Sequence, residues 1–148
     1  DVIEKRLQKA KELGATEVIN GKEKDAVEEV LRLTGGAGSD LVLETAGTDI
    51  TANQAVRMAK KGSTIVMVGY SASGEITLPM SLALDKELCF KTVFRYRHIY
   101  PMAIEAVASG KVDIKGIVTN VFELDEIADG LEQCVKNKAE IVKAVIKI

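Results

Sequence analysis

The chain has 148 residues, of which 47% are apolar and 28% are charged, and its formal net charge is -2. This length can bury a core of its own, and the composition is that of a globular protein and not a disordered one. The small negative charge argues against a nucleic-acid surface, because neutralising phosphates needs a basic excess. No apolar run approaches the roughly 18 residues that a membrane span requires.

The first half of the chain alternates helical and strand patterns. The expected elements, in order, are a helix over 2–13, a strand over 16–20, a helix over 22–34, a strand over 40–45, a helix over 49–60 and a strand over 63–68. Asp49 is a plausible N-cap for the third helix. The order predicts a parallel sheet with right-handed crossovers, helices on both faces and a buried strand at 40–45.

The second half continues with different spacing. A loop over 70–84 precedes a strand over 89–94, and Pro101 lies near the first turn of a helix that ends at Gly110. The last third predicts a strand over 117–122, a helix from 124 to about 135 and an edge strand over 143–148. Two cysteines, Cys89 and Cys134, lie far apart. We expect two buried thiols, which suits a reducing, cytoplasmic setting.

The glycine pattern bears on cofactor binding. A complete dinucleotide fold has a G-x-G-x-x-G turn after its first strand and an acidic residue about 20 positions later, at the end of the second strand. The glycine-rich segment 35–38 follows a helix instead of a strand, so we interpret it as a simple turn. Asp1 stands where the second strand of such a fold would end, although an Asp before a helix is also typical of an N-cap.

A cationic and aromatic cluster, Phe94-Arg95-Tyr96, ends the strand predicted over 89–94. In an open α/β sheet, ligands bind at the carboxyl ends of strands. Judged by residue type alone, Arg95 could equally form a surface ion pair. His98 is the only histidine of the chain, and we expect it to be a loop or helix-start residue.

Several segments together resemble medium-chain dehydrogenases, over nearly all of the chain. They are Asp1, Arg6-Leu7, Lys9-Ala10, Leu13-Gly14-Ala15, Glu44-Thr45-Ala46-Gly47, Val68-Gly69, Val93-Phe94-Arg95-Tyr96, Ile117-Val118-Thr119 and Phe122-Glu123-Leu124. Within that family, Phe-Arg-Tyr resembles a phrase of sorbitol dehydrogenases, which are zinc-dependent polyol dehydrogenases. The resemblance implies the carboxyl-terminal segment of a longer enzyme.

The fold implied by this resemblance is α/β. Residues 1–112 would form a partial doubly wound (Rossmann) parallel sheet, a dinucleotide-binding domain that lacks its first strands. Residues 113–148 would return to the catalytic domain with a helix and a strand.

The resemblance also implies the site residues. Those expected to bind the cofactor are Asp1, Arg6, Thr45, Ala46, Val68, Gly69, Tyr70, Val93, Phe94 and Arg95. Asp1 would bind the adenosine ribose and favour NAD over NADP, because its carboxylate would repel a 2′-phosphate. Arg6 leaves that preference open, since a nearby guanidinium could accommodate a phosphate. Arg95 and Tyr96 would bind the substrate, because a polyol needs hydrogen-bond donors and acceptors.

The implied activity is hydride transfer from a secondary alcohol of sorbitol or L-iditol type to NAD, which yields a ketone. The family's zinc ligands and catalytic residues come from another domain, so we expect none in this segment and no activity from it alone. Two alternatives stay open: another medium-chain alcohol dehydrogenase, of threonine or butanediol type, or a non-catalytic segment that acts only in dimer assembly. A homodimer or homotetramer through the edge strand 89–94 is expected.

Overall fold

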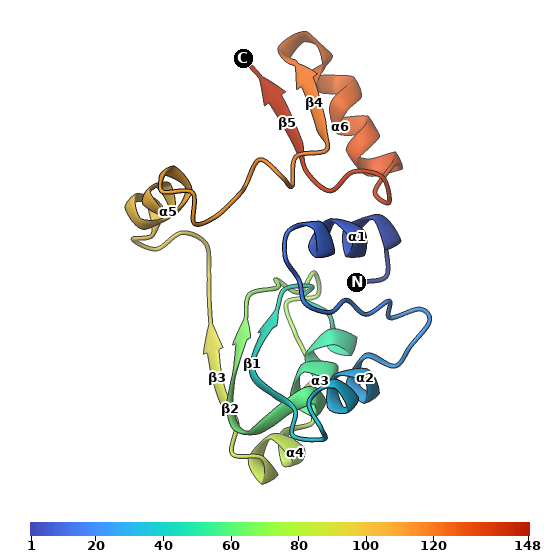
Figure 1. Cartoon of the computed structure of the whole chain (residues 1–148), viewed down its shortest axis with the longest axis vertical. Coiled ribbons are helices and arrows are strands. Elements are labelled where there is room, and N and C mark those ends of the chain that lie inside the picture. Colours follow the sequence, from blue (N-terminus) through green and yellow to red (C-terminus); the bar gives the residue numbers. More distant parts are fainter. The chain divides into compact units, whose positions relative to one another are not determined.

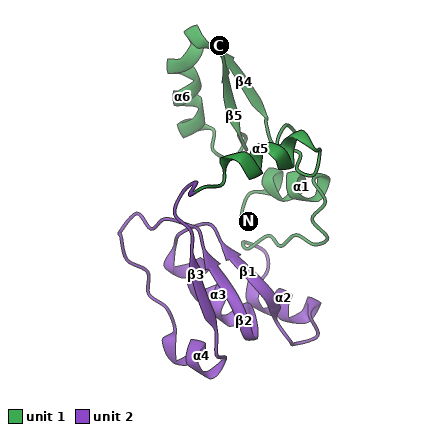
Figure 2. Ribbon diagram, turned by 90° about the vertical axis from the view of Figure 1, so that its left-hand side faces the viewer, with its two compact units in different colours: residues 1–22, 98–148 green, residues 23–97 purple.

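The computed structural model describes all 148 residues and divides them into two compact units (Figure 2). One unit comprises residues 1–22 and 98–148, and the other comprises residues 23–97. The first holds α1 (Glu4–Glu12), α5 (Tyr100–Ala108), β4 (Asn120–Glu123), the 3-10 helix η1 (Leu124–Glu126), α6 (Ile127–Lys136) and β5 (Ala144–Lys147). The second holds α2 (Ala26–Leu33), β1 (Ser39–Glu44), α3 (Asp49–Met58), β2 (Ala59–Met67), α4 (Met80–Asp85) and β3 (Cys89–Thr92).

The unit of residues 23–97 is built on a parallel three-stranded sheet in the order β1-β2-β3 (Figure 1). Val42, Ile65 and Phe90 are neighbours in register across the three strands. Their shared face packs on a core that α3 and α4 complete, with the buried residues Ala55, Val56, Ala59, Ile65 and Ala83. The α/β class with parallel strands is confirmed.

The opposite face of this sheet differs from expectation. Leu41 and Leu43 are 56% and 61% exposed, because side chains alternate between the two faces of a strand and the core of the unit lies on the other face. The strand predicted as buried is therefore buried on one face only. Cys89 is exposed and Cys134 is half-buried, so the expectation of two buried thiols is wrong for Cys89.

The two ends of α3 are held by side chains. Thr48 is its N-cap, because its hydroxyl accepts the N–H of Thr51; the predicted N-cap, Asp49, instead lies in the first turn and accepts the N–H of Thr77. At the other end the Lys86 ammonium donates to the carbonyls of Val56, Arg57 and Ala59. Desolvation by burial lowers the pKa of Lys86.

Helix α4 lies inside the segment predicted as a loop. It is only six residues long and follows Pro79, so its periodicity is too brief to stand out from a turn. Leu78 and Leu82 pack against the core of the unit, and Ala83 is buried in it. Burial of these side chains, more than helix propensity, accounts for the helix.

The unit of residues 1–22 and 98–148 contains the second sheet. β4 and β5 form a parallel pair, and α6 brings the buried Gly130 against the ring of Phe122. The strand predicted over 16–20 does not form. The Asp1 ammonium donates to the carbonyl of Ile19, and the Lys11 ammonium donates to the carbonyl of Thr16. A strand needs a ladder partner, and the periodicity of one segment cannot supply it.

Candidate functional site

A pocket of about 440 Å³ lies at the carboxyl ends of β2 and β3. Val68, Gly69 and Tyr70 line it from the segment after β2, and Val93, Phe94 and Arg95 line it from the segment after β3. Parallel neighbours end at the same edge of a sheet, so the two segments leave the sheet side by side. This edge is where open α/β sheets bind ligands.

Aromatic rings and one guanidinium form the outer part of the pocket. The ring centroids of Tyr70 and Phe94 are 6.4 Å apart, and Cζ of Arg95 lies 5.0 Å from the centre of the Phe94 ring. The two rings are 80% and 67% exposed, respectively. A flat apolar surface beside a cation suits a planar ring that carries polar or anionic groups.

The backbone of Arg95 is strained. Its φ is 57°, in the left-handed region that only glycine enters freely. Such a conformation costs on the order of 1–3 kcal/mol and is frequent at functional sites. Here it occurs in the residue whose guanidinium stacks on Phe94 and lines the pocket.

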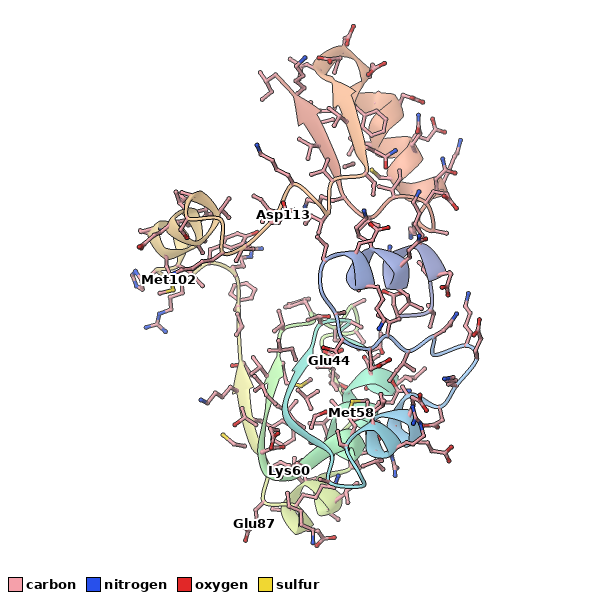
Figure 3. The ribbon with its side chains drawn as sticks, viewed as in Figure 1. Glu44, Met58, Lys60, Glu87, Met102 and Asp113 are labelled. Atoms are coloured by element: carbon pink, nitrogen blue, oxygen red, sulfur yellow. The ribbon has the colours of Figure 1, made fainter.

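Glu44, at the carboxyl end of β1, is a buried residue that organises the backbone beside the pocket (Figure 3). Its side-chain oxygen Oε1 accepts the N–H groups of Ala46 and Gly47, both at 2.9 Å, and the hydroxyl of Thr51 at 2.8 Å. The second oxygen, Oε2, lies 3.2 Å from the Gly47 nitrogen. The main-chain carbonyl of Glu44 accepts the N–H groups of Val68 and Gly69, at 2.8 and 2.9 Å.

Two glycines, Gly47 and Gly69, let the turn after β1 and the segment after β2 pass close to each other. A Cβ on Gly69 would collide with the Gly47 backbone and lie 2.7 Å from Oε2 of Glu44. A Cβ on Gly47, where φ is +68°, would lie 2.5 Å from the carbonyl oxygen of Tyr70. Neither glycine can be replaced by a residue with a side chain, because in both cases the added Cβ would collide with backbone atoms.

The structure brings six of the ten predicted cofactor-binding residues together around one pocket: Val68, Gly69, Tyr70, Val93, Phe94 and Arg95. Ala46 lies in the turn that Glu44 holds, directly after Thr45. Tyr96, predicted to bind substrate, is 63% exposed. The roles assigned to these residues stay predictions.

Asp1 and Arg6 belong to the other unit. The carboxylate of Asp1 accepts the N–H groups of Val2 and Ile3, and Arg6 Nη1 lies 3.8 Å from its other oxygen. Arg6 also donates to the carbonyl of Lys138. The N-cap position of α1 is Ile3, so the alternative reading of Asp1 as an N-cap is wrong.

Glu44 is not among the site residues predicted from the sequence. It belongs to the segment Glu44-Thr45-Ala46-Gly47 that carries the family resemblance, and it stands at the end of an apolar strand three positions before a glycine. In the chain, no three His, Cys, Asp or Glu side chains lie close enough together to hold a metal ion. The structure likewise contains no helix that is long and apolar enough to cross a membrane.

Comparison with known proteins decides the family. The model of the family described as zinc-binding dehydrogenase matches residues 1–109, which is most of the chain. The chain belongs to the zinc-binding dehydrogenase family. The resemblance to medium-chain zinc dehydrogenases is thereby confirmed at the level of the family.

Relatives within this family agree with that assignment. The chain is 40% identical over 148 residues to a zinc-type alcohol dehydrogenase-like protein, YdjJ, of Escherichia coli K12, covering 100% of the chain and 42% of that protein. It is 36% identical over 141 residues to a sorbitol dehydrogenase of Bacillus subtilis, covering 95% of the chain and 40% of that protein. The chain thus spans about two fifths of the length of these relatives.

Solved structures of this family extend the comparison to the fold. An Escherichia coli oxidoreductase/dehydrogenase of unknown specificity matches with a TM-score of 0.92 and 40% identity, covering 100% of the chain and 42% of that structure. A Sinorhizobium meliloti structure with bound NADP matches with a TM-score of 0.88 and 27% identity, covering 100% of the chain and 44% of that structure. The Sinorhizobium meliloti protein, described as a putative zinc-binding dehydrogenase, thus binds NADP.

Proposed function

We propose that these 148 residues are the cofactor- and substrate-binding carboxyl-terminal part of an NAD-dependent polyol dehydrogenase that oxidises a secondary alcohol to a ketone. The observation that carries the proposal is the pocket at the carboxyl ends of β2 and β3, lined by six of the residues expected to bind the cofactor. The identity with a sorbitol dehydrogenase of Bacillus subtilis supports the substrate class.

The residues of the pocket fit a nicotinamide. Val68 and Val93 offer apolar contact, and Phe94 offers a flat surface. When bound, NAD supplies the acceptor for the hydride that leaves the alcohol carbon. The side chains of this chain would bind and orient NAD and the alcohol. They do not form a metal site, so no step of zinc chemistry is assigned to them.

Arg95 is the residue to which we assign substrate recognition. Its guanidinium lies beside the aromatic surface, where its fixed donors can pair with polyol hydroxyls. The stacking contact with Phe94 positions these donors in advance, which lowers the entropy lost on binding.

The proposal is tested with a panel of alcohols, measured as kcat/KM on the complete polypeptide that carries this segment. Sorbitol and xylitol are compared with threonine and 2,3-butanediol, each with NAD and with NADP. We expect the polyols and NAD to give the highest values. For Arg95→Ala we expect kcat/KM for polyols to fall by about 10- to 100-fold, the ratio for one or two lost hydrogen bonds to a charged group.

Arg97→Ala is the matched control, because Arg97 is an exposed arginine that does not line the pocket. A higher kcat/KM with threonine or 2,3-butanediol would replace the polyol assignment with another alcohol dehydrogenase. Absence of saturable NAD binding, together with self-association, would favour the segment as an assembly module.

A further inference from the structure

We infer that Glu44, supported by Thr51, is a positioning residue for the nicotinamide pocket; this inference rests on the proposed function. Glu44 does not line the pocket, and β2 lies between its strand and β3. It acts through the backbone segments that it joins, and its own side chain is not expected to touch the cofactor.

Glu44 is buried, and hydrogen bonds hold its carboxylate. The residue is 4% exposed, and three neutral donors meet its side-chain oxygen Oε1: two backbone N–H groups and the Thr51 hydroxyl. Burying a carboxylate is costly unless hydrogen bonds stabilise it. These bonds therefore lock the turn over residues 45–47 to the carboxyl end of β1.

The turn over residues 45–47 is joined to the wall of the pocket. The main-chain carbonyl of Glu44 accepts from Val68 and Gly69, which both line the pocket. The turn also packs against this wall, because Gly47 lies directly on the backbone of Tyr70 and Gly69. Glu44 thus supports the pocket wall in two ways. Its main-chain carbonyl bonds to the wall directly, and its side chain orders the turn that packs against the wall.

Thr51, in the first half of α3, connects that helix to the carboxylate of Glu44. Its hydroxyl donates to Oε1 of Glu44 and lies 2.8 Å from the hydroxyl of Thr48, while its N–H bonds to the Thr48 cap. The start of α3 and the turn before it are therefore one hydrogen-bonded assembly. Removing the Thr51 hydroxyl should cost the Glu44 carboxylate one hydrogen bond and leave its bonds to the N–H groups of Ala46 and Gly47 in place.

The experiment measures nicotinamide dinucleotide binding and kinetics on the complete polypeptide, with NADH and NADPH as probes. In Glu44→Gln the carbonyl oxygen can take the place of Oε1, and an NH₂ group then takes the place of Oε2, 3.2 Å from the Gly47 nitrogen, which sets a donor against a donor. We expect Glu44→Gln to raise the Kd for the preferred dinucleotide by about tenfold, the ratio for one lost hydrogen bond to a charged group. The KM for the dinucleotide should rise in parallel, with the KM for the alcohol unchanged within about twofold.

Thr51 provides a matched pair of variants. Thr51→Val removes the hydroxyl and should weaken dinucleotide binding, whereas Thr51→Ser keeps the donor and should bind like the wild type. Amide hydrogen exchange of Ala46 and Gly47 should speed up in Glu44→Gln and Thr51→Val, and stay slow in Thr51→Ser. This readout requires no bound ligand.

A control for general stability is Thr34→Val. The hydroxyl of Thr34 donates to the Val30 carbonyl and accepts the N–H of Gly38, far along the chain from the pocket. It should lower stability without changing the KM for the dinucleotide, because a smaller folded fraction lowers the apparent kcat alone.

The outcomes separate this inference from the proposed function. Wild-type dinucleotide affinity in Glu44→Gln, or loss of kcat alone, would overturn the positioning role while leaving the polyol dehydrogenase proposal intact. Failure of polyols in the substrate panel, with weakened dinucleotide binding in Glu44→Gln, would overturn the substrate class and support the positioning role. If neither NADH nor NADPH binds the wild type, both are overturned.

Discussion

Two carboxylates, Glu29 and Glu44, differ in the partners that surround them. Glu29, in α2, receives two hydrogen bonds from the guanidinium of Arg32, one turn along the helix, and one from the ammonium of Lys24. The hydrogen bond from Arg32 is the largest cause that lowers the pKa of Glu29 from 4.5 to about 2. Glu44 is also a carboxylate, but its partners are backbone N–H groups and a hydroxyl, and its effect is on backbone geometry.

The lowered pKa of Glu29 predicts a pH dependence of stability. Because the folded-state pKa lies below the ordinary value, the stabilisation is fully present above about pH 4.5 and is lost as the pH falls toward 2. Glu29→Gln should therefore be less stable than the wild type at pH 6, with the difference shrinking at low pH. Urea unfolding from pH 2.5 to 7 measures this. Glu28→Gln, at an exposed neighbour, is the control, and an equal pH response of both variants would contradict the assignment.

At the scale of elements, the crossing of the turn after β1 with the segment after β2 defines the edge of the sheet that holds the pocket. The crossing depends on two glycines for different reasons. Gly47 needs the left-handed backbone and close approach, whereas Gly69 needs the space alone. A sequence pattern of strand, glycine, helix indicates a turn, but it does not indicate which other segment touches that turn.

Gly69→Ala should destabilise the chain and disrupt the pocket. The added Cβ would collide with the backbone of Gly47, which cannot move without breaking its bond to Glu44, so we expect a loss of about 2–4 kcal/mol by the usual cost of overpacking and lost hydrogen bonds. Gly21→Ala is the control, since the nearest atom to its Cβ would be 3.6 Å away, at ordinary contact distance. Thermal unfolding of both variants tests this prediction, and equal unfolding midpoints for Gly69→Ala and Gly21→Ala would contradict it.

At the scale of the whole molecule, the open edge of β3 bears on assembly. β3 pairs with β2 alone, so its second edge presents unpaired backbone groups. The N–H of Val93 donates inward, to Met67. By the alternation of a parallel ladder, the N–H groups of Phe90 and Thr92 point outward.

We propose that this edge pairs with its counterpart in a second copy of the protein, as a homodimer or a homotetramer. Thr92→Pro removes an outward donor and leaves the ladder with β2 in place, so it should shift the protein toward monomer in sedimentation velocity. Thr92→Ala keeps the N–H and should leave the oligomeric state unchanged. A monomeric wild type, or an oligomer that survives Thr92→Pro, would contradict pairing through this edge.

The sequence by itself indicated the α/β class, the parallel direction of the main strands and the resemblance to the family. Strong periodicity marked the segments that became α3, β1 and β2, and the segments around Glu44-Thr45-Ala46-Gly47 and Phe94-Arg95-Tyr96 carried the resemblance. These features are local, because each depends on neighbouring residues in the chain.

The tertiary structure alone decided which residues meet. The strand predicted over 16–20 found no ladder partner, α4 formed where a loop was expected, and one face of β1 stayed exposed. The role of Glu44 also became visible only in three dimensions, because its partners come from three separate segments. Burial and hydrogen-bond pairing depend on long-range contacts, which local periodicity does not encode.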